Sequence, residues 1–232
     1  MIKLRNMLVA MIAITALSTS AYAGSVGFGV TGSLAAIGAS GHESEGGAAP
    51  TDSSSAMSHN NTMIGSVFAE YIFDGMNGVA IGVDYIPGSA AVNADTLTRT
   101  DIELSKDATV ATTANSLKRT AKAEVENHMT IYLEVPMHAG LYAKVGHTKM
   151  DVNTLETLTG GSSYGNTDVS GTVVGLGYKH DSGGSWYYKL EGTHTDFDSL
   201  RITEKNQSLG ATNTIKADLD VTRATFALGY KF

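Results

Sequence analysis

The residues best suited to chemistry in this 232-residue chain are its histidines and the acidic side chains beside them. One group lies within a single polar segment and consists of His42, Glu43, Glu45, Asp52 and His59. Imidazole and carboxylate groups bind divalent cations, but a metal site has a characteristic ligand spacing, which this segment lacks. We therefore favour a solvated acidic loop here, and we expect neither a metal nor another cofactor.

Charged side chains also recur at alternate positions of apolar segments. In VENHMTIYLEV, the apolar residues Met129, Ile131, Leu133 and Val135 share one parity, which extends back to Val125. The other parity of the same stretch carries Glu124, Glu126, His128, Thr130 and Glu134. Helical spacing cannot produce this pattern, whereas a strand with one apolar and one polar face does. Similar alternation in other segments indicates a largely β-structured chain.

Eight strands are predicted by this alternation and by the turn residues between the segments. Their approximate ranges are 25–37, 63–73, 78–87, 122–135, 140–151, 169–180, 185–197 and 218–232. Three connections are tight, at 74–77, 136–139 and 181–184. The other four are long and polar, including those that start at residues 38 and 88. Such loops are improbable in a compact soluble domain, but an antiparallel membrane barrel has short turns on one side and long loops on the other.

The first 23 residues have the composition of a secretory signal peptide. Lys3 and Arg5 precede an apolar run, and the small residues at its end predict cleavage between Ala23 and Gly24. Residues 24–232 would then form one outer-membrane β-barrel domain. Removing the leader takes away two of 16 basic and none of 23 acidic residues, leaving a formal charge of −9, which argues against a nucleic-acid partner. The absence of cysteine excludes disulfides and thiolate metal sites.

The last strand supplies the most specific pattern. The chain ends in ATFALGYKF, where Phe226, Leu228, Tyr230 and Phe232 alternate with smaller or polar residues. In lipid every backbone group must be paired, so a spanning sheet has to close and its last strand must meet the first.

This terminal strand resembles the closing strand of bacterial outer-membrane β-barrel proteins. Together with GLGYKH and LEGTHTDFD, it makes the chain similar to the small eight-stranded OmpA-like and OmpX-like transmembrane barrels. The resemblance implies an all-β fold, a closed antiparallel eight-stranded up-and-down barrel in the bacterial outer membrane, with both termini periplasmic. It also implies that outer-membrane lipid surrounds the barrel. During biogenesis, the terminal signal Phe226, Leu228, Tyr230 and Phe232 would be read by the barrel assembly machinery, and periplasmic chaperones would be further partners.

If the apolar parity faces lipid, the polar parity must fill the lumen. The interior of an eight-stranded barrel is only wide enough for side chains, and buried charges are tolerated when they are paired. We therefore predict a plug of salt bridges rather than a selectivity filter. The predicted lumen charges are Glu70, Asp84, Glu124, Glu126, Glu134 and Glu191, opposed by Lys122, Lys144, Lys179, Lys189, Arg223 and Lys231.

Aromatic residues gather near the short turns and the end of the chain. Outward aromatics at this level would form the interfacial girdle of a membrane barrel, although aromatic residues are also enriched in strands generally. The predicted girdle consists of Tyr71, Phe73, Tyr178, Trp186, Tyr230 and Phe232.

The function that these patterns favour is structural. We expect a non-enzymatic, plugged outer-membrane barrel whose four long loops act in adhesion, surface masking or envelope stability, with no loop partner identifiable. His194, Thr195, Asp196 and Ser199 invite comparison with barrel lipid A deacylases, but Asp196 stands where that comparison requires a serine nucleophile. A narrow, porin-like pore for ions or small solutes is the first alternative. A soluble periplasmic lipocalin-like barrel with its apolar parity inward is the second.

Overall fold

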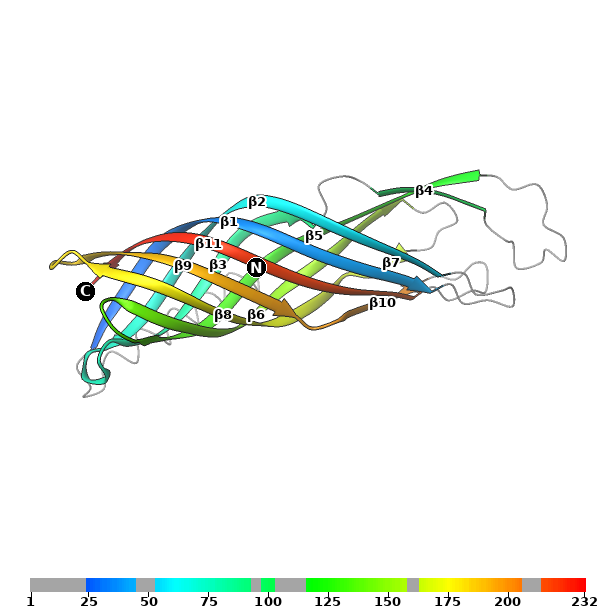
Figure 1. Cartoon of the computed structure of the whole chain (residues 1–232). Helices are drawn as coiled ribbons and strands as arrows, with labels where there is room; N and C mark the ends of the chain where they lie inside the picture. The colour runs from blue at the N-terminus through cyan, green and yellow to red at the C-terminus, as the bar shows by residue number, and fades with distance from the viewer. Residues whose placement is uncertain (1–23, 45–52, 93–96, 103–115, 158–162, 206–213) are drawn as a thin grey trace.

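Eight long antiparallel strands close into a barrel in the computed structural model, which describes residues 24–44, 53–92, 97–102, 116–157, 163–205 and 214–232 (Figure 1). Each strand pairs with the next one along the chain, and the last pairs with the first, from Gly27 with Lys231 to Ser44 with Thr214. This confirms the predicted eight-stranded up-and-down barrel. The eight strands are β1 (Gly24–Ser44), β2 (Ser53–Phe73), β3 (Val79–Ala91), β5 (Ser116–Pro136), β6 (Leu141–Thr157), β8 (Thr167–Asp181), β9 (Trp186–Phe197) and β11 (Thr214–Lys231).

Three short strands extend the sheet beyond the barrel. β4 (Leu97–Ile102) pairs with β5, β10 (Leu200–Lys205) pairs with β11, and β7 (Ser163–Tyr164) pairs with β10. The predicted signal peptide lies outside the described residues. Within the described ranges, no helix is long and apolar enough to cross a membrane.

The three predicted tight turns lie together at one end, which we call the turn end. The first contains the 3-10 helix η1 (Asp74–Met76) and closes with Asn77 and Gly78, at φ values of 58° and 83°. The second closes with Ala139 and Gly140, also at positive φ. These left-handed conformations reverse the chain within a few residues, and glycine adopts them without steric cost. We call the opposite end the loop end.

At the loop end the strands run further than the sequence pattern predicted. β1 continues to Ser44 instead of ending at residue 37, and β2 begins at Ser53 instead of 63. β5 similarly begins at Ser116, so much of the polar sequence from 38 and from 88 belongs to strands rather than loops. The prediction was wrong because polar residues occupy both faces of these extensions, so alternation is lost while the backbone ladder continues.

The apolar parity faces outward. Leu34, Leu176 and Phe226 are 61%, 62% and 51% exposed. Glu70 and Lys189, which alternate with the apolar residues of their own strands, are 0% and 1% exposed. A soluble barrel would bury its apolar face and expose its charges. The lipocalin-like alternative is therefore wrong for this fold.

Two of the predicted lumen charges, Glu124 and Glu126, lie outside the lumen because β5 contains a β-bulge. Asn127 has a φ of 53°, and the pairing of β5 with β6 shifts between Glu126 and Met129. Because the extra residue reverses the parity, Val125 packs against an inner apolar cluster, while Glu124 and Glu126 point to the outer face. There, the Nδ2 groups of Asn127 and Asn153 both donate hydrogen bonds to Glu126.

A second irregularity interrupts the backbone ladder between β2 and β3. These strands pair only from Val67–Tyr85 to Phe73–Val79, although β2 remains paired with β1 as far as Ser53. Beyond Tyr85, β3 contains Pro87, which lacks an N–H, and Gly88, at a φ of 89°. Among the described residues, no backbone pair joins residues 53–66 of β2 to residues 86–91 of β3, although the Asn60 Nδ2 donates a hydrogen bond to the Ala91 carbonyl at 3.1 Å. We call this gap the side opening.

Candidate functional site

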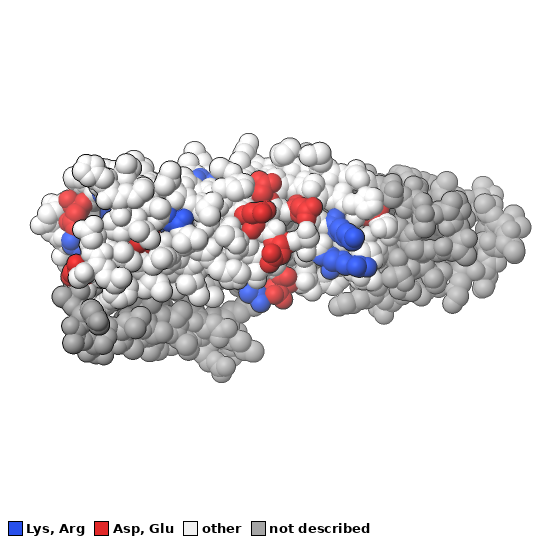
Figure 2. All heavy atoms as spheres, turned by 60° about the horizontal axis from the view of Figure 1, so that its bottom comes forward, with Lys and Arg blue, Asp and Glu red and all other residues white. Residues whose placement is uncertain are grey.

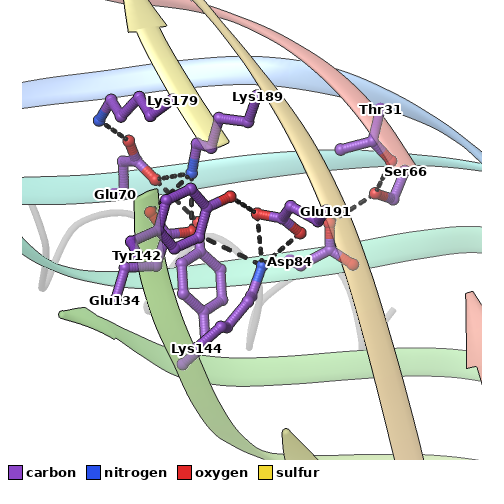
Figure 3. Close-up of polar contacts among 11 residues, drawn as sticks. Thr31, Ser66, Glu70, Asp84, Glu134, Tyr142, Lys144, Lys179, Lys189 and Glu191 are labelled. Carbon is purple, nitrogen blue, oxygen red and sulfur yellow. Dashed lines mark hydrogen bonds and ion pairs between the residues drawn. The ribbon is translucent and has the colours of Figure 1, made fainter. Parts of the chain in front are cut away.

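The turn-end half of the lumen contains a continuous series of ion pairs, which we call the plug (Figure 3). Lys189 on β9 lies at its centre, with Nζ 2.5 Å from Glu70 Oε2 and 2.8 Å from Glu134 Oε1. Glu70, on β2, also binds Lys179 of β8 at 3.0 Å. Because these residues come from strands on different sides of the barrel, the ion pairs cross the lumen instead of running along one wall.

The series continues on the other side of Glu134. Lys144 Nζ lies 3.6 Å from Glu134 Oε1 and 2.9 Å from Glu191 Oε2. The Tyr142 hydroxyl donates to Glu191 at 2.5 Å. Six predicted lumen charges are thus brought together, namely Glu70, Glu134, Lys144, Lys179, Lys189 and Glu191. Lys179 has the most exposed side chain of these bases, at 22%, so it marks the turn-end limit of the plug.

Tyrosines fill the space between the ion pairs, and the sequence analysis did not identify them. Tyr132 donates to Glu70 at 3.1 Å, and Lys144 Nζ lies 3.9 Å from the centre of the Tyr132 ring. A side chain at Gly82 would come within 2.4 Å of that ring, so the glycine makes room for it. Parity could have revealed Tyr132, Tyr142 and Tyr187, since each lies two residues from a plug charge on the same strand: Glu134, Lys144 and Lys189.

The remaining predicted lumen charges have separate environments. Asp84 and Arg223 are both 7% exposed and lie beyond the plug, where Ser66 donates to Asp84 at 2.5 Å. Lys231 pairs with Asp181 at the turn end instead of joining the plug, and both side chains are partly exposed. The Lys122 side chain lies outside the described residues.

The predicted girdle residues lie near the turn end, but their environments differ. Trp186, Tyr230 and Phe232 form a series of edge-to-face contacts, with ring centroids 5.1 and 4.9 Å apart. Trp186 and Phe232 are exposed on the outer face, as is Tyr178 at 36%. Tyr71 packs edge to face on Phe73, within a cluster that also contains Ala69.

The loop-end half of the interior contains an apolar cluster. Met150, Val152, Val169 and Phe197 form its buried cluster, and Val221 packs against them. Beside this cluster lies a cavity of about 130 Å³, which we call the apolar pocket. Its lining includes the inward Ile37, Met150, Phe197 and Val221, and also Gly65 and Pro87 from the two edges of the side opening. The pocket therefore reaches from the interior into the barrel wall.

The candidate catalytic group does not converge. Thr195 faces the interior and is 1% exposed, whereas His194 and Asp196 lie on the exposed outer face. His194 Nδ1 lies 3.0 Å from the Thr222 hydroxyl, and Ser199 donates to Asp218 at 2.5 Å. Neither contact combines the base, hydroxyl and orienting group required for nucleophilic catalysis. Among the described residues, no group of histidine and acidic side chains could hold a metal ion.

The outer surface is charged on the loop-end side of the apolar band. Figure 2 shows acidic side chains gathered across the outer face, with a largely uncharged surface between them and the turn end. Charges on the lipid face of a barrel are costly at the bilayer midplane and tolerated at its interfaces. The change in surface therefore marks one edge of the membrane-embedded band. The outward acids include Asp168, Asp196, Asp198, Asp218 and Asp220.

Comparison with solved structures finds similar chains at low sequence identity. The outer membrane protein OprG from Pseudomonas aeruginosa is 12% identical, with a TM-score of 0.52 over 91% of this chain and 97% of that one. AlkL is 14% identical, with a TM-score of 0.43 over 92% and 93% of the two chains. Neisserial surface protein A is 12% identical, with a TM-score of 0.34 over 86% and 97%. No curated protein matches the sequence significantly.

The family assignment rests on the sequence of nearly the whole chain. The model of the outer membrane protein beta-barrel domain matches residues 9–232, which include all eight barrel strands. The match agrees with the closed sheet, the apolar outer face and the charged interior. This chain therefore belongs to the outer membrane protein beta-barrel domain family and is an integral β-barrel of the Gram-negative outer membrane.

Proposed function

We propose that this protein is a plugged, non-conducting barrel that anchors a rigid, strand-built extension on the outside of the cell. The observation that carries this proposal is the plug, in which Lys189 binds Glu70 and Glu134 across the lumen. The family supports the outer-membrane location, and we place the loop end outside and both termini in the periplasm. The role is structural and not enzymatic.

The length of the strands supports a function at the surface. β1, β2 and β5 each contain 21 residues, whereas roughly 9–11 residues suffice to cross the hydrocarbon core of a membrane. About half of each strand therefore projects beyond the membrane, where backbone pairing and the apolar cluster around Phe197 stiffen it. A stiff projection would hold the loops away from the lipid, in a role in adhesion, surface masking or envelope stability.

Conductance in planar bilayers tests the plug directly. We expect the purified protein to show no discrete channel steps, because the ion pairs and tyrosines occupy the cross-section of the lumen. Steps with the wild-type protein would favour the narrow-pore alternative and overturn the proposal. A Lys144→Ala and Glu191→Ala double variant is the positive control, since it removes paired volume at the inner limit of the plug.

Shortening the extension tests the surface role. Removing residues 42–55 deletes the ends of β1 and β2 beyond the Gly41–Ala56 pair, so the remaining register is kept. We expect cells carrying this variant to assemble normal amounts of barrel but to change in surface adhesion or phage sensitivity. If shortening each projecting hairpin in turn leaves both properties unchanged, display is not the function.

The side opening favours a second candidate function, the entry of small apolar molecules. The unpaired edges of β2 and β3 lie beside the apolar pocket, and outward Met63, 83% exposed, lies at its margin. Unpaired backbone at membrane depth is tolerated only where it lines a protein cavity or an aqueous path. An apolar molecule could pass between the outer leaflet and the pocket without crossing the plug.

Closing the side opening tests this second function. The chain contains no cysteine, so a Gly65→Cys and Gly88→Cys double variant can be bridged selectively with a bifunctional maleimide. We expect bridging to lower the uptake of a hydrophobic fluorescent probe, whereas the two single variants treated with the same reagent should retain it. Equal uptake by bridged and unbridged barrels would rule out entry through the side opening.

A further inference from the structure

Arg223 is a buried base whose charge the plug does not neutralise. It is 7% exposed, its Nε has no hydrogen-bond partner, and it forms no ion pair with any described residue. Buried charges normally occur with a partner, because removal from water costs several kcal/mol unless hydrogen bonds and an opposite charge compensate. The buried Nε without a partner therefore leaves a donor free for a ligand, which makes Arg223 a candidate binding group.

The position of Arg223 specifies what such a ligand must contain. Its side chain lines the apolar pocket on one side, together with the polar residues Glu126, His128 and Thr195. On the other side it lines a small polar cavity of about 10 Å³ that it shares with Asp84. Arg223 thus lies at the floor of the apolar pocket, at the boundary with the charged interior. A ligand reaching it from the pocket would meet apolar side chains first and a cation last.

We propose that the apolar pocket binds the carboxylate end of an apolar molecule, with Arg223 as the binding group. A guanidinium presents paired N–H donors that match a carboxylate, and such charge-assisted hydrogen bonds are among the strongest in proteins. Ile37, Met150 and Val221 would contact the first carbons of the chain. This inference rests on the side entry proposed above as the second function.

The size of the pocket limits how much of the ligand it can hold. A cavity of about 150 Å³ lined by apolar residues binds benzene in another protein, and the apolar pocket, at about 130 Å³, is of similar size. It can therefore enclose the carboxylate and a few carbons. The rest of a longer chain would pass between Gly65 and Pro87 into the outer leaflet. An alkanoate of medium length fits this description.

Water is the competing occupant. Asp84 Oδ1 also has no hydrogen-bond partner, and it lines the same small cavity as Arg223, whose volume is close to that of one water molecule. A water molecule there could bridge Asp84 and Arg223 without any other ligand. In that case Arg223 would have no preference for a carboxylate in the apolar pocket.

Equilibrium binding of radiolabelled decanoate and decan-1-ol to barrels in lipid nanodiscs, with empty nanodiscs subtracted, separates these cases. We expect the wild-type barrel to bind decanoate at least tenfold more tightly than decanol. Arg223→Gln should bind both equally, whereas the control Arg201→Gln, which changes an exposed outer-face residue, should behave as wild type. The shift in gel mobility on boiling verifies that each variant is folded.

The outcomes distinguish the two proposals. Equal binding of the two ligands by the wild-type protein overturns the role of Arg223 but leaves side entry standing, whereas binding of neither ligand contradicts both. If Arg223→Gln does not fold, the ¹³C carboxyl resonance of labelled decanoate provides a test on the wild-type barrel. A carboxylate beside the guanidinium should stay ionised to a lower pH than decanoate in empty nanodiscs, and identical titrations would refute the proposal.

Discussion

Replacing Lys189 with methionine would leave two buried carboxylates without their shared partner. Glu70 would retain Lys179 at 3.0 Å, but Glu134 would retain only the longer contact with Lys144, at 3.6 Å. Removing one partner of a buried ion pair typically costs about 3–5 kcal/mol. Since Lys189 is 1% exposed and contacts both acids, we expect Lys189→Met to lower the free energy of unfolding by about 4 kcal/mol.

Two comparison variants separate loss of charge pairing from loss of packing. Lys179→Met should cost only about 1 kcal/mol, because its side chain is 22% exposed and Glu70 keeps its shorter contact with Lys189. Adding Glu134→Gln to Lys189→Met should recover part of the loss, since it removes one unpaired charge. A purely steric effect would instead make the double variant no more stable than the single one.

Unfolding by urea in phospholipid vesicles provides the measurement. The single tryptophan, Trp186, is 54% exposed on the outer face, so its fluorescence reports the transfer of the barrel between lipid and water. A charge-dependent plug would be refuted if Lys189→Met cost less than about 1 kcal/mol, the range of exposed ion pairs. It would also fail if Lys179→Met were equally destabilising.

Three further predictions follow from the barrel wall and the turn end. Gly82→Ala should cost about 1–3 kcal/mol of stability, because its Cβ would lie 2.4 Å from a buried tyrosine ring. The control Gly32→Ala should not destabilise the barrel, because a Cβ there would have nothing within 4 Å. Urea unfolding of both variants measures the difference. Lys231→Gln should change stability by less than about 1 kcal/mol, and titration with salt should reduce the difference, since its ion pair is partly exposed. Phe232→Ala should slow barrel assembly in cells while leaving the refolded protein close to wild-type stability, and equal rates of appearance of the heat-modifiable form would contradict an assembly role.

The family and fold could be predicted because their determinants are local. Ile131, Leu133 and Val135 alternate with Tyr132 and Glu134, and this period of two specifies one apolar and one polar face wherever the strand is placed. The tight turns could also be predicted, since residues such as Asn77 and Gly183, which adopt positive φ, are typical of turns. The same alternation predicted strands that were too short at the loop end, because the projecting parts of the strands no longer separate an apolar face from a polar one.

What the sequence by itself determined was which residues alternate, where the chain turns tightly and that its charges need a sheltered, paired environment. Only the tertiary structure decided which charges meet, because Lys189 and Glu70 are 119 positions apart and the barrel register brings them together. Register also decided that Glu124 and Glu126 lie outside, since one extra residue at Asn127 reverses the faces of β5. The side opening depends in the same way on where pairing between β2 and β3 stops, a property of two strands together that neither segment carries alone.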